Sequence, residues 1–203
     1  SDEIRKEIGD KVVAGAKAVG YCGLATFEFL RDSRGDFYFL EVNPRVQVEH
    51  TVTEMITGTD LVSMGIRVAS GESIKLVQDD IHIRGHAIQV RLNAENPVTL
   101  SPSPGKLWEC HWPGGPGVRI DTHAHTGYDM PASFDSLLAK LIVWAPTRDE
   151  SISKLIAALH EIKLLGVDTL IPLHLAILSE NDFRKRDITI HYLEEHPNLL
   201  SEG

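Results

Sequence analysis

The stretch FEFLRDSRGDFYFLEVNPRVQVE, residues 27–49, determines how the first part of this chain is expected to fold. Two apolar, aromatic-rich runs, 24–30 and 37–42, flank a cluster of turn-forming residues that includes Gly35. Runs of β-forming residues separated by such a cluster are typical of a β-hairpin. We therefore predict two antiparallel strands joined by a tight turn.

The register of this hairpin brings two acidic residues together. A two-residue turn at Arg34-Gly35 places Glu28 directly opposite Glu41, on the same face of the sheet. Adjacent carboxylates destabilise a sheet unless positive charge lies between them. With the amide oxygen of Asn43, they form an all-oxygen ligand set suited to Mg²⁺ or Mn²⁺. An exposed polar face on an edge hairpin is the alternative interpretation.

Polar and apolar residues alternate throughout 41–49, which predicts extended chain with the odd-numbered residues on one face. Beyond the two possible metal ligands, that face carries Arg45, Gln47 and Glu49. A forked cationic donor beside a carboxylate is what a small planar oxyanion needs. The row therefore favours an anion site over a merely charged strand edge.

The remaining patterns predict an α+β protein that divides near residue 80. Before this boundary, helical spacing of apolar residues predicts a helix over 4–19, which Ser1 and Asp2 can cap and Gly20 can end. Two short helices, 53–56 and 61–69, follow the hairpin.

Beyond the boundary, four segments are expected to form strands: 85–94, 106–112, 118–122 and 137–144. A helical stripe predicts a helix over 148–165, and Pro172 opens another that ends near Ser179. The second part therefore combines a β-sheet with helices.

The composition argues against several classes of protein. A formal charge of −9 disfavours binding to nucleic acid or to an anionic membrane through net charge. Two distant cysteines suggest neither a disulfide framework nor a thiolate zinc site. No apolar run approaches membrane-spanning length, and no export signal is evident. Because the chain opens at Ser1 without a methionine, we expect a piece of a longer polypeptide.

The row at 41–49 resembles the signature of the biotin carboxylases, and similar segments recur along nearly the whole chain. These are FEF (27–29), EVNPRVQVEHTVTE (41–54), RGHA (84–87), RLNAE (91–95), SPSPG (101–105), PGG (113–115) and FDSLLAK (134–140). The resemblance implies that 1–80 form the C-terminal part of an ATP-grasp domain with a metal and bicarbonate site. It implies that 81–203 form the biotin carboxylase C-terminal domain, an antiparallel sheet with flanking helices.

Members of this family use ATP and bicarbonate to carboxylate biotin on a carrier protein. The resemblance assigns the Mg²⁺ or Mn²⁺ ligands to Glu28, Glu41 and Asn43, and the ATP side of the site to Glu28, Leu30 and Glu41.

The resemblance also assigns the bicarbonate and biotin chemistry. It places bicarbonate on Arg45, Gln47 and the backbone N–H of Val48, and it makes Glu49 the base. Arg91 would face biotin and stabilise its enolate. Catalysis would therefore depend on Glu49, Arg91 and Arg45.

The resemblance implies partners and a location as well. We expect a biotin carboxyl carrier protein or domain, a carboxyltransferase, and a homodimer of the parent protein. We expect the cytoplasm, or the mitochondrial matrix of a eukaryote. The match to Arg119 lies at the family's dimer interface, although Pro116 replaces an aromatic residue of some relatives.

Complete relatives carry an upstream nucleotide-binding half and a glycine-rich lid, so we expect the 203 residues alone to be inactive. The final acceptor, for example an acyl-CoA, pyruvate or urea, is chosen by a carboxyltransferase. Two alternatives are another ATP-grasp ligase, such as a carbamoyl phosphate synthetase relative, and a non-catalytic dimerisation module. Another ATP-grasp ligase would not explain why the sequence contains both the polar row at 41–49 and Arg91.

Two further combinations suggest chemistry less strongly. His123 and His125 form a His-x-His pair, but no third ligand follows at metal-binding spacing, so surface or packing roles are favoured. Ser133, Asp135 and His111 lack the sharp turn that exposes a nucleophilic serine. We assign no site to either combination.

Overall fold

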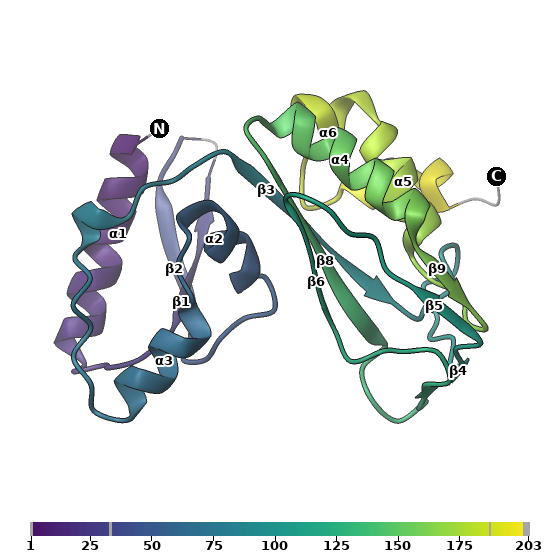
Figure 1. Ribbon diagram of the computed structural model, residues 1–203. Coiled ribbons are helices and arrows are strands. Elements are labelled where there is room, and N and C mark those ends of the chain that lie inside the picture. The colour runs from purple at the N-terminus through teal and green to yellow at the C-terminus, as the bar shows by residue number, and fades with distance from the viewer. Residues whose placement is uncertain (1, 33, 187, 201–203) are drawn as a thin grey trace. The chain divides into compact units, whose positions relative to one another are not determined.

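The chain divides into two compact units, Ser1–His82 and Ile83–Gly203, each of which contains helices and strands (Figure 1). The computed structural model describes residues 2–32, 34–186 and 188–200. The α+β class predicted from the sequence is confirmed. The predicted cap at Ser1 lies outside the described residues.

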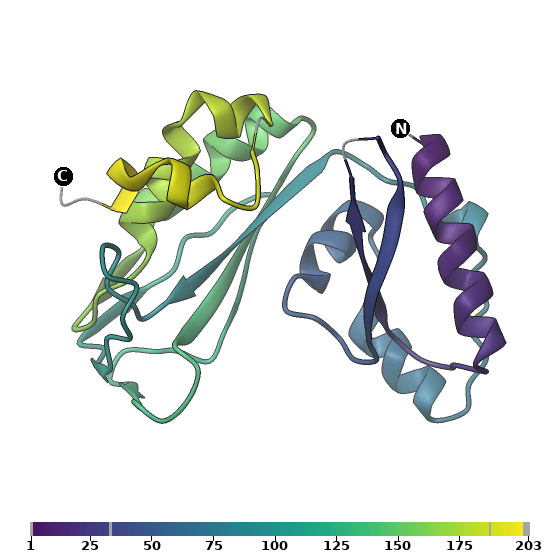
Figure 2. The ribbon, with the colours of Figure 1, turned by 180° about the vertical axis from the view of Figure 1, so that it is seen from behind.

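The first unit is built around a two-stranded hairpin. Its elements are α1 (Asp2–Ala18), β1 (Thr26–Arg31), β2 (Phe37–Asn43), α2 (His50–Thr57), α3 (Leu61–Ala69) and the 3₁₀ turn η1 (Gln78–Asp80). Helix α1 runs alongside the hairpin (Figure 2), and a Cβ added at Gly15 would lie 3.7 Å from the Phe27 ring. The helix ends where Gly20 takes a positive φ of 65°, as its sequence predicts.

The hairpin confirms the pairing of Glu28 with Glu41 but not the predicted turn. Near the turn, Arg31 pairs with Phe37 and Phe29 with Phe39, so the loop is longer than two residues. A bulge at Leu40 then shifts the register by one residue, and Glu28 pairs with Glu41 after all. The loop and the bulge therefore compensate for each other.

The predicted extended row over 41–49 is wrong beyond Asn43, where β2 ends. Pro44 follows, the chain turns at Val48 and Glu49, and α2 begins at His50. Proline has no N–H to continue a strand ladder, which explains the end of β2. The polar residues after Asn43 therefore lie on a turn rather than on one face of a strand.

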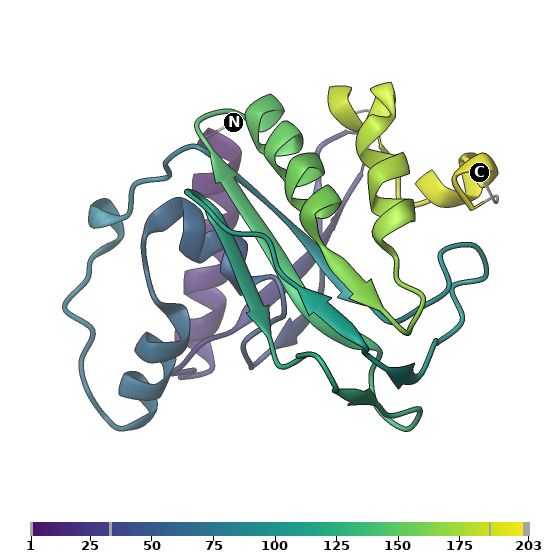
Figure 3. The same cartoon turned by 45° about the vertical axis from the view of Figure 1, so that its right-hand side comes forward.

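The second unit contains a three-stranded antiparallel sheet in the order β3-β8-β6, with two short strand pairs, β4-β7 and β5-β9 (Figure 3). Its strands are β3 (His86–Asn93), β4 (Gly105–Lys106), β5 (Glu109–His111), β6 (Val118–Thr122), β7 (Asp129–Met130), β8 (Leu137–Ala145) and β9 (Lys163–Leu165). Its helices are α4 (Arg148–Glu161), α5 (Ile171–Ser179), α6 (Asn181–Lys185), α7 (Tyr192–Glu195) and the 3₁₀ turn η2 (Pro197–Leu200).

Two predictions for this unit need correction. The expected strand over 106–112 is two short strands, β4 and β5, with different partners. The expected helix over 148–165 ends at Glu161, and Lys163–Leu165 form β9, which pairs with β5. Ile162 and Leu164 are both buried, and apolar spacing over so short a segment is compatible with either a helix or a strand, so the spacing alone did not reveal the change.

The two faces of the central sheet differ in chemistry. On one face, Leu92, Leu141 and Val143 are fully buried in a core shared with Ile152 and Leu155 of α4. On the other face, the register aligns Arg91 of β3, Lys140 of β8 and Asp121 of β6 in one row. This charged row therefore lies on the face opposite that core, a face that also buries Ile142.

Candidate functional site

The paired carboxylates of the hairpin are linked by one amide. Nδ2 of Asn43 donates hydrogen bonds to Oε1 of Glu28 at 2.8 Å and to Oε1 of Glu41 at 3.1 Å. Nε2 of Gln47 donates to the same Glu28 oxygen at 3.1 Å. Because these N–H groups carry partial positive charge, they reduce the repulsion between the two carboxylates.

This arrangement fits a hard divalent cation. Two carboxylates and an amide oxygen are ligands that Mg²⁺ and Mn²⁺ prefer, and such sites take their remaining ligands from phosphates and water. Among the described residues, no three His, Cys, Asp or Glu side chains converge on a common point, so the amide is needed to complete the set. Oδ1 of Asn43 faces Arg45 Nη2 at 3.4 Å. Turning the amide over would present that oxygen to a cation.

The residues assigned to bicarbonate, Arg45, Gln47 and Val48, and the base Glu49 follow Asn43 in the chain. Arg45 is exposed, and its Nη1 donates to the carbonyl of Val46 at 3.2 Å. Val48 and Glu49 form the turn before α2, where Glu49 is the N-cap residue with φ −82° and ψ 5°. Leu30 of β1 is 59% exposed on the Glu28 side of its strand. The structure therefore brings Glu28, Glu41, Asn43 and Gln47 together, with Arg45 beside them.

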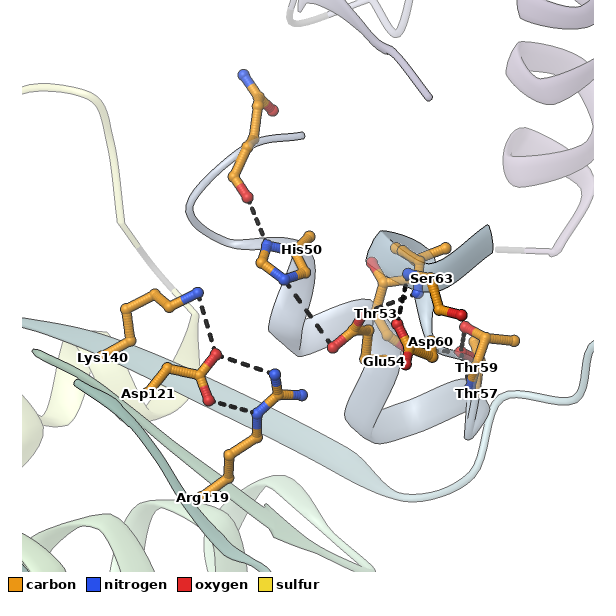
Figure 4. A network of polar contacts seen from close by, with 12 residues as sticks. His50, Thr53, Glu54, Thr57, Thr59, Asp60, Ser63, Arg119, Asp121 and Lys140 are labelled. Carbon is orange, nitrogen blue, oxygen red and sulfur yellow. Dashed lines mark hydrogen bonds and ion pairs between the residues drawn. The ribbon is translucent and has the colours of Figure 1, made fainter. Parts of the chain in front are cut away.

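A buried polar network in the first unit supports the Gln47 turn. Nδ1 of His50 lies 2.7 Å from the carbonyl oxygen of Gln47, and its Nε2 lies 3.9 Å from Oε2 of Glu54 (Figure 4). Glu54 is 8% exposed, and its Oε1 accepts a hydrogen bond from the N–H of Leu61 at 2.8 Å. The network thereby ties the turn to α2 and to the start of α3.

Sequence reasoning assigned no role to His50 or Glu54, although both lie in the quoted signature. Their i, i+4 spacing on one helix was the available signal, because such residues lie on the same face. Whether that face is buried is a tertiary property, and spacing alone does not reveal it.

Arg91 belongs to the second unit. It is an exposed residue of β3, and its carbonyl lies 2.9 Å from Nε2 of His174 in α5. Burial holds the pKa of His174 below its ordinary value, although the hydrogen bond to Arg91 opposes this shift. The neutral imidazole therefore supports the backbone of the strand that presents the arginine.

The charged row beside Arg91 is held by ion pairs. Asp121 contacts Arg119 Nε at 2.7 Å and Lys140 Nζ at 3.3 Å (Figure 4). Partial burial opposes ionisation of Asp121, but these two cations hold its pKa below the ordinary value. Arg119, which the resemblance placed at a dimer interface, is thus paired within its own sheet.

His123, His125 and Asp135, to which the sequence analysis assigned no site, each contact a neighbouring residue. His123 and His125 both lie edge-on to the Tyr128 ring, with centroid separations of 5.0 and 5.9 Å. Oδ1 of Asp135 accepts a hydrogen bond from the N–H of Leu137.

None of the helices in the described part of the chain is long and apolar enough to cross a membrane.

Comparison with known proteins places this geometry in a family. Residues 89–195 match the model of the biotin carboxylase C-terminal domain. Residues 1–77 match that of the ATP-binding domain of the carbamoyl-phosphate synthase L chain. The chain is 48% identical to the biotin carboxylase of Haemophilus influenzae over 96% of its own length and 43% of that relative. It is 47% identical to the chloroplastic biotin carboxylase of Arabidopsis thaliana over 98% of its own length and 37% of that relative.

Solved structures show the same fold. The biotin carboxylase domain of Hydrogenobacter thermophilus 2-oxoglutarate carboxylase, a dimer in complex with MgADP, ADP and bicarbonate, matches with a TM-score of 0.97 and 43% identity. The match covers 100% of this chain and 45% of that one. The chain thus spans less than half the length of the relatives it matches. With the end of an ATP-grasp domain followed by a biotin carboxylase C-terminal domain, it belongs to the biotin carboxylase family.

Proposed function

We propose that this chain supplies the metal, bicarbonate and biotin-facing parts of a biotin carboxylase, which uses ATP and bicarbonate to carboxylate biotin on a carrier protein. The observation that carries the proposal is the Glu28–Asn43–Glu41 bridge, with Gln47 on the same carboxylate and Arg45 beside the amide. A cation position and an anion position are thus adjacent, as the joining of bicarbonate to a phosphoryl group requires.

On the metal side, Glu28, Glu41 and Oδ1 of Asn43 would hold Mg²⁺ or Mn²⁺, and Leu30 would border the ATP phosphates. The cation would neutralise charge on the phosphate oxygens during phosphoryl transfer. The bound MgADP of the Hydrogenobacter relative supports this assignment. The role of this chain is to orient three oxygen ligands from one rigid hairpin.

On the anion side, Arg45, Gln47 and the backbone N–H of Val48 would hold bicarbonate, and Glu49 would remove its proton. The resulting carbonate oxygen attacks the γ-phosphorus of ATP, which forms carboxyphosphate and releases ADP. Carboxyphosphate then breaks into CO₂ and phosphate, and the phosphate takes the N1 proton of biotin as N1 attacks CO₂. The guanidinium of Arg91 would stabilise the negative charge that develops on the ureido oxygen.

The partners follow from the family. The parent protein would dimerise, as the Hydrogenobacter domain does, and would work with a biotin carrier and a carboxyltransferase. Relatives are named as carboxylases of pyruvate and of 2-oxoglutarate, so the acceptor is chosen outside these residues. Because the chain spans 43% of its bacterial relative, we propose that the 203 residues alone do not cleave ATP.

The test is substitution in a full-length protein that contains this chain. Glu49→Gln and Arg91→Ala should each lower biotin carboxylation at least about a hundredfold, the scale for losing a general base or an electrostatic catalyst. The exposed residues Glu109 and Arg34 provide the controls Glu109→Gln and Arg34→Ala, which should stay within about twofold. Full activity in both site variants would exclude the proposal and favour a non-catalytic module.

A further inference from the structure

One face of the central sheet carries an excess of positive charge next to Arg91. The register of β3, β8 and β6 aligns Arg91, Lys140 and Asp121 in one row across the sheet, with Lys140 in the middle. Arg119 lies two residues before Asp121 on β6, so its side chain is on the same face. On this face the three strands therefore carry three cations and one carboxylate.

The carboxylate of Asp121 is engaged by two of these cations (Figure 4). Its Oδ1 accepts a hydrogen bond from Nε of Arg119 at 2.7 Å, and its Oδ2 accepts one from Nη2 of the same guanidinium at 2.9 Å. Nζ of Lys140 lies 3.3 Å from Oδ2. Lys140 thus both pairs with Asp121 and separates it from Arg91 in the row.

Lys140 is also the direct cross-strand partner of Arg91. The Cβ atoms of such partners on one face of an antiparallel pair lie about 4.5–5.5 Å apart. The side chain of Lys140 is 13% exposed, so water and salt screen its charge less than that of a surface lysine. Like charges directly opposite each other are destabilising unless an anion offsets them. Because one carboxylate cannot balance three cations, the row favours a further negative charge beside Arg91.

We infer that Lys140 is a positioning residue for Arg91: it occupies the Asp121 carboxylate and keeps the row positive, so that the Arg91 guanidinium stays available to its ligand. The inference rests on the proposed function, in which the ligand is the ureido oxygen of biotin as negative charge develops there. Without Lys140, Asp121 would lie two strands from Arg91, about 10 Å between Cα atoms, a gap that the two side chains can bridge. It would then neutralise charge that the ureido oxygen needs.

A direct contact between Lys140 and the ligand is the competing explanation, because an ammonium group has three N–H donors. The two roles depend differently on Asp121. A positioning role depends on the charge balance of the row, so neutralising Asp121 compensates for the loss of Lys140. A direct contact is lost with the ammonium, whatever residue stands at the position of Asp121.

The test is a double-mutant cycle in a full-length protein that contains this chain, with kcat and the KM for biotin measured separately. Lys140→Met keeps an unbranched stem but removes the charge, and should lower kcat about tenfold or more while KM changes less than about threefold. Asp121→Asn alone should lower kcat less than about threefold. The double variant restores the net charge of the row and should recover kcat to within about threefold of the parent. Lys140→Arg should recover it similarly.

The absence of recovery in the double variant would overturn the inference. Lys163→Met is the matched control, because it removes a lysine from an exposed ion pair with Glu109 and should leave kcat within about twofold. An equal loss in Lys163→Met would also overturn the inference, since the effect would then be one of general charge.

Arg91→Ala in the same protein separates this inference from the proposed function. If Arg91→Ala lowers carboxylation and Lys140→Met does not, the positioning role of Lys140 fails and the proposed function stands. If Arg91→Ala keeps full activity, the proposed role of Arg91 fails, and the inference fails with it.

Discussion

Glu28 and Glu41 lie directly opposite each other because a bulge at Leu40 compensates for the loop that joins their strands. The Asn43 amide then donates to both carboxylates from the end of β2. The hairpin thus presents two acids and one amide from a single rigid element. Several measurable consequences follow from this arrangement and from the supports around it.

Replacing the bridging amide by a carboxylate tests the cation position. Asn43→Asp removes two hydrogen bonds and adds a third negative charge, which should cost about 1–2 kcal/mol of unfolding free energy without metal. Mn²⁺ should recover this loss, because the new carboxylate is an additional hard ligand. Urea unfolding with and without Mn²⁺ measures both effects.

Asn43→Leu is the matched control for this prediction. It removes the same two hydrogen bonds without adding charge, so it should be destabilised and Mn²⁺ should not rescue it. Equal stabilisation of both variants by Mn²⁺ would show that the metal binds elsewhere.

The buried carboxylate of Glu54 should be important for the stability of the first unit. Glu54→Ala leaves the N–H of Leu61 without its acceptor, which should cost about 2–3 kcal/mol. Glu72→Ala, in an exposed ion pair with Arg67, should change stability by less than about 0.5 kcal/mol. Chemical unfolding of the two variants side by side makes the comparison. Similar losses in both would mean that the Glu54 network adds nothing beyond a surface pair.

The backbone strain at Arg186 predicts a stabilising substitution. Arg186→Gly relieves a left-handed conformation that disfavours residues with a Cβ, and should raise unfolding free energy by about 0.5–1 kcal/mol. Lys185→Gly, one residue earlier and within α6, should lower it by up to about 1 kcal/mol. Thermal unfolding measures the two effects, and a loss of stability in Arg186→Gly would contradict the assigned strain.

His174 should make the second unit less stable in mild acid. Its folded pKa is lowered, so below its ordinary value near 6.5 the unfolded state binds the proton more readily. Stability from this group is therefore complete above about pH 6.5 and is lost as the pH falls toward the lowered folded value. His174→Gln, whose amide can still donate to the Arg91 carbonyl, should reduce the stability difference between about pH 7.5 and 5.5.

The exposed His125 provides the control for the pH experiment. His125→Gln also removes one imidazole, at an exposed position, and is measured alongside His174→Gln. An equal reduction in both variants would assign the effect to general charge rather than to burial of His174.

Local patterns in the sequence determined much of the fold and the nature of the site. The helix that ends before Gly20, the presence of a hairpin between residues 26 and 43, and the strand carrying Arg91 all follow from period and turn chemistry. These features depend on residues close together in the chain, so spacing was enough to predict them.

Tertiary structure decided the rest, because pairing and burial depend on residues far apart in sequence. Pairing with Glu109–His111 made Lys163–Leu165 a strand where a helix also satisfied the apolar spacing. Packing around α2 buries Glu54, and this carboxylate stabilises the turn after Gln47 through His50. Contact between α4 and α6 brought the Arg148 guanidinium to the carbonyl and ring of Phe183, and no local pattern encodes an encounter between residues so distant along the chain.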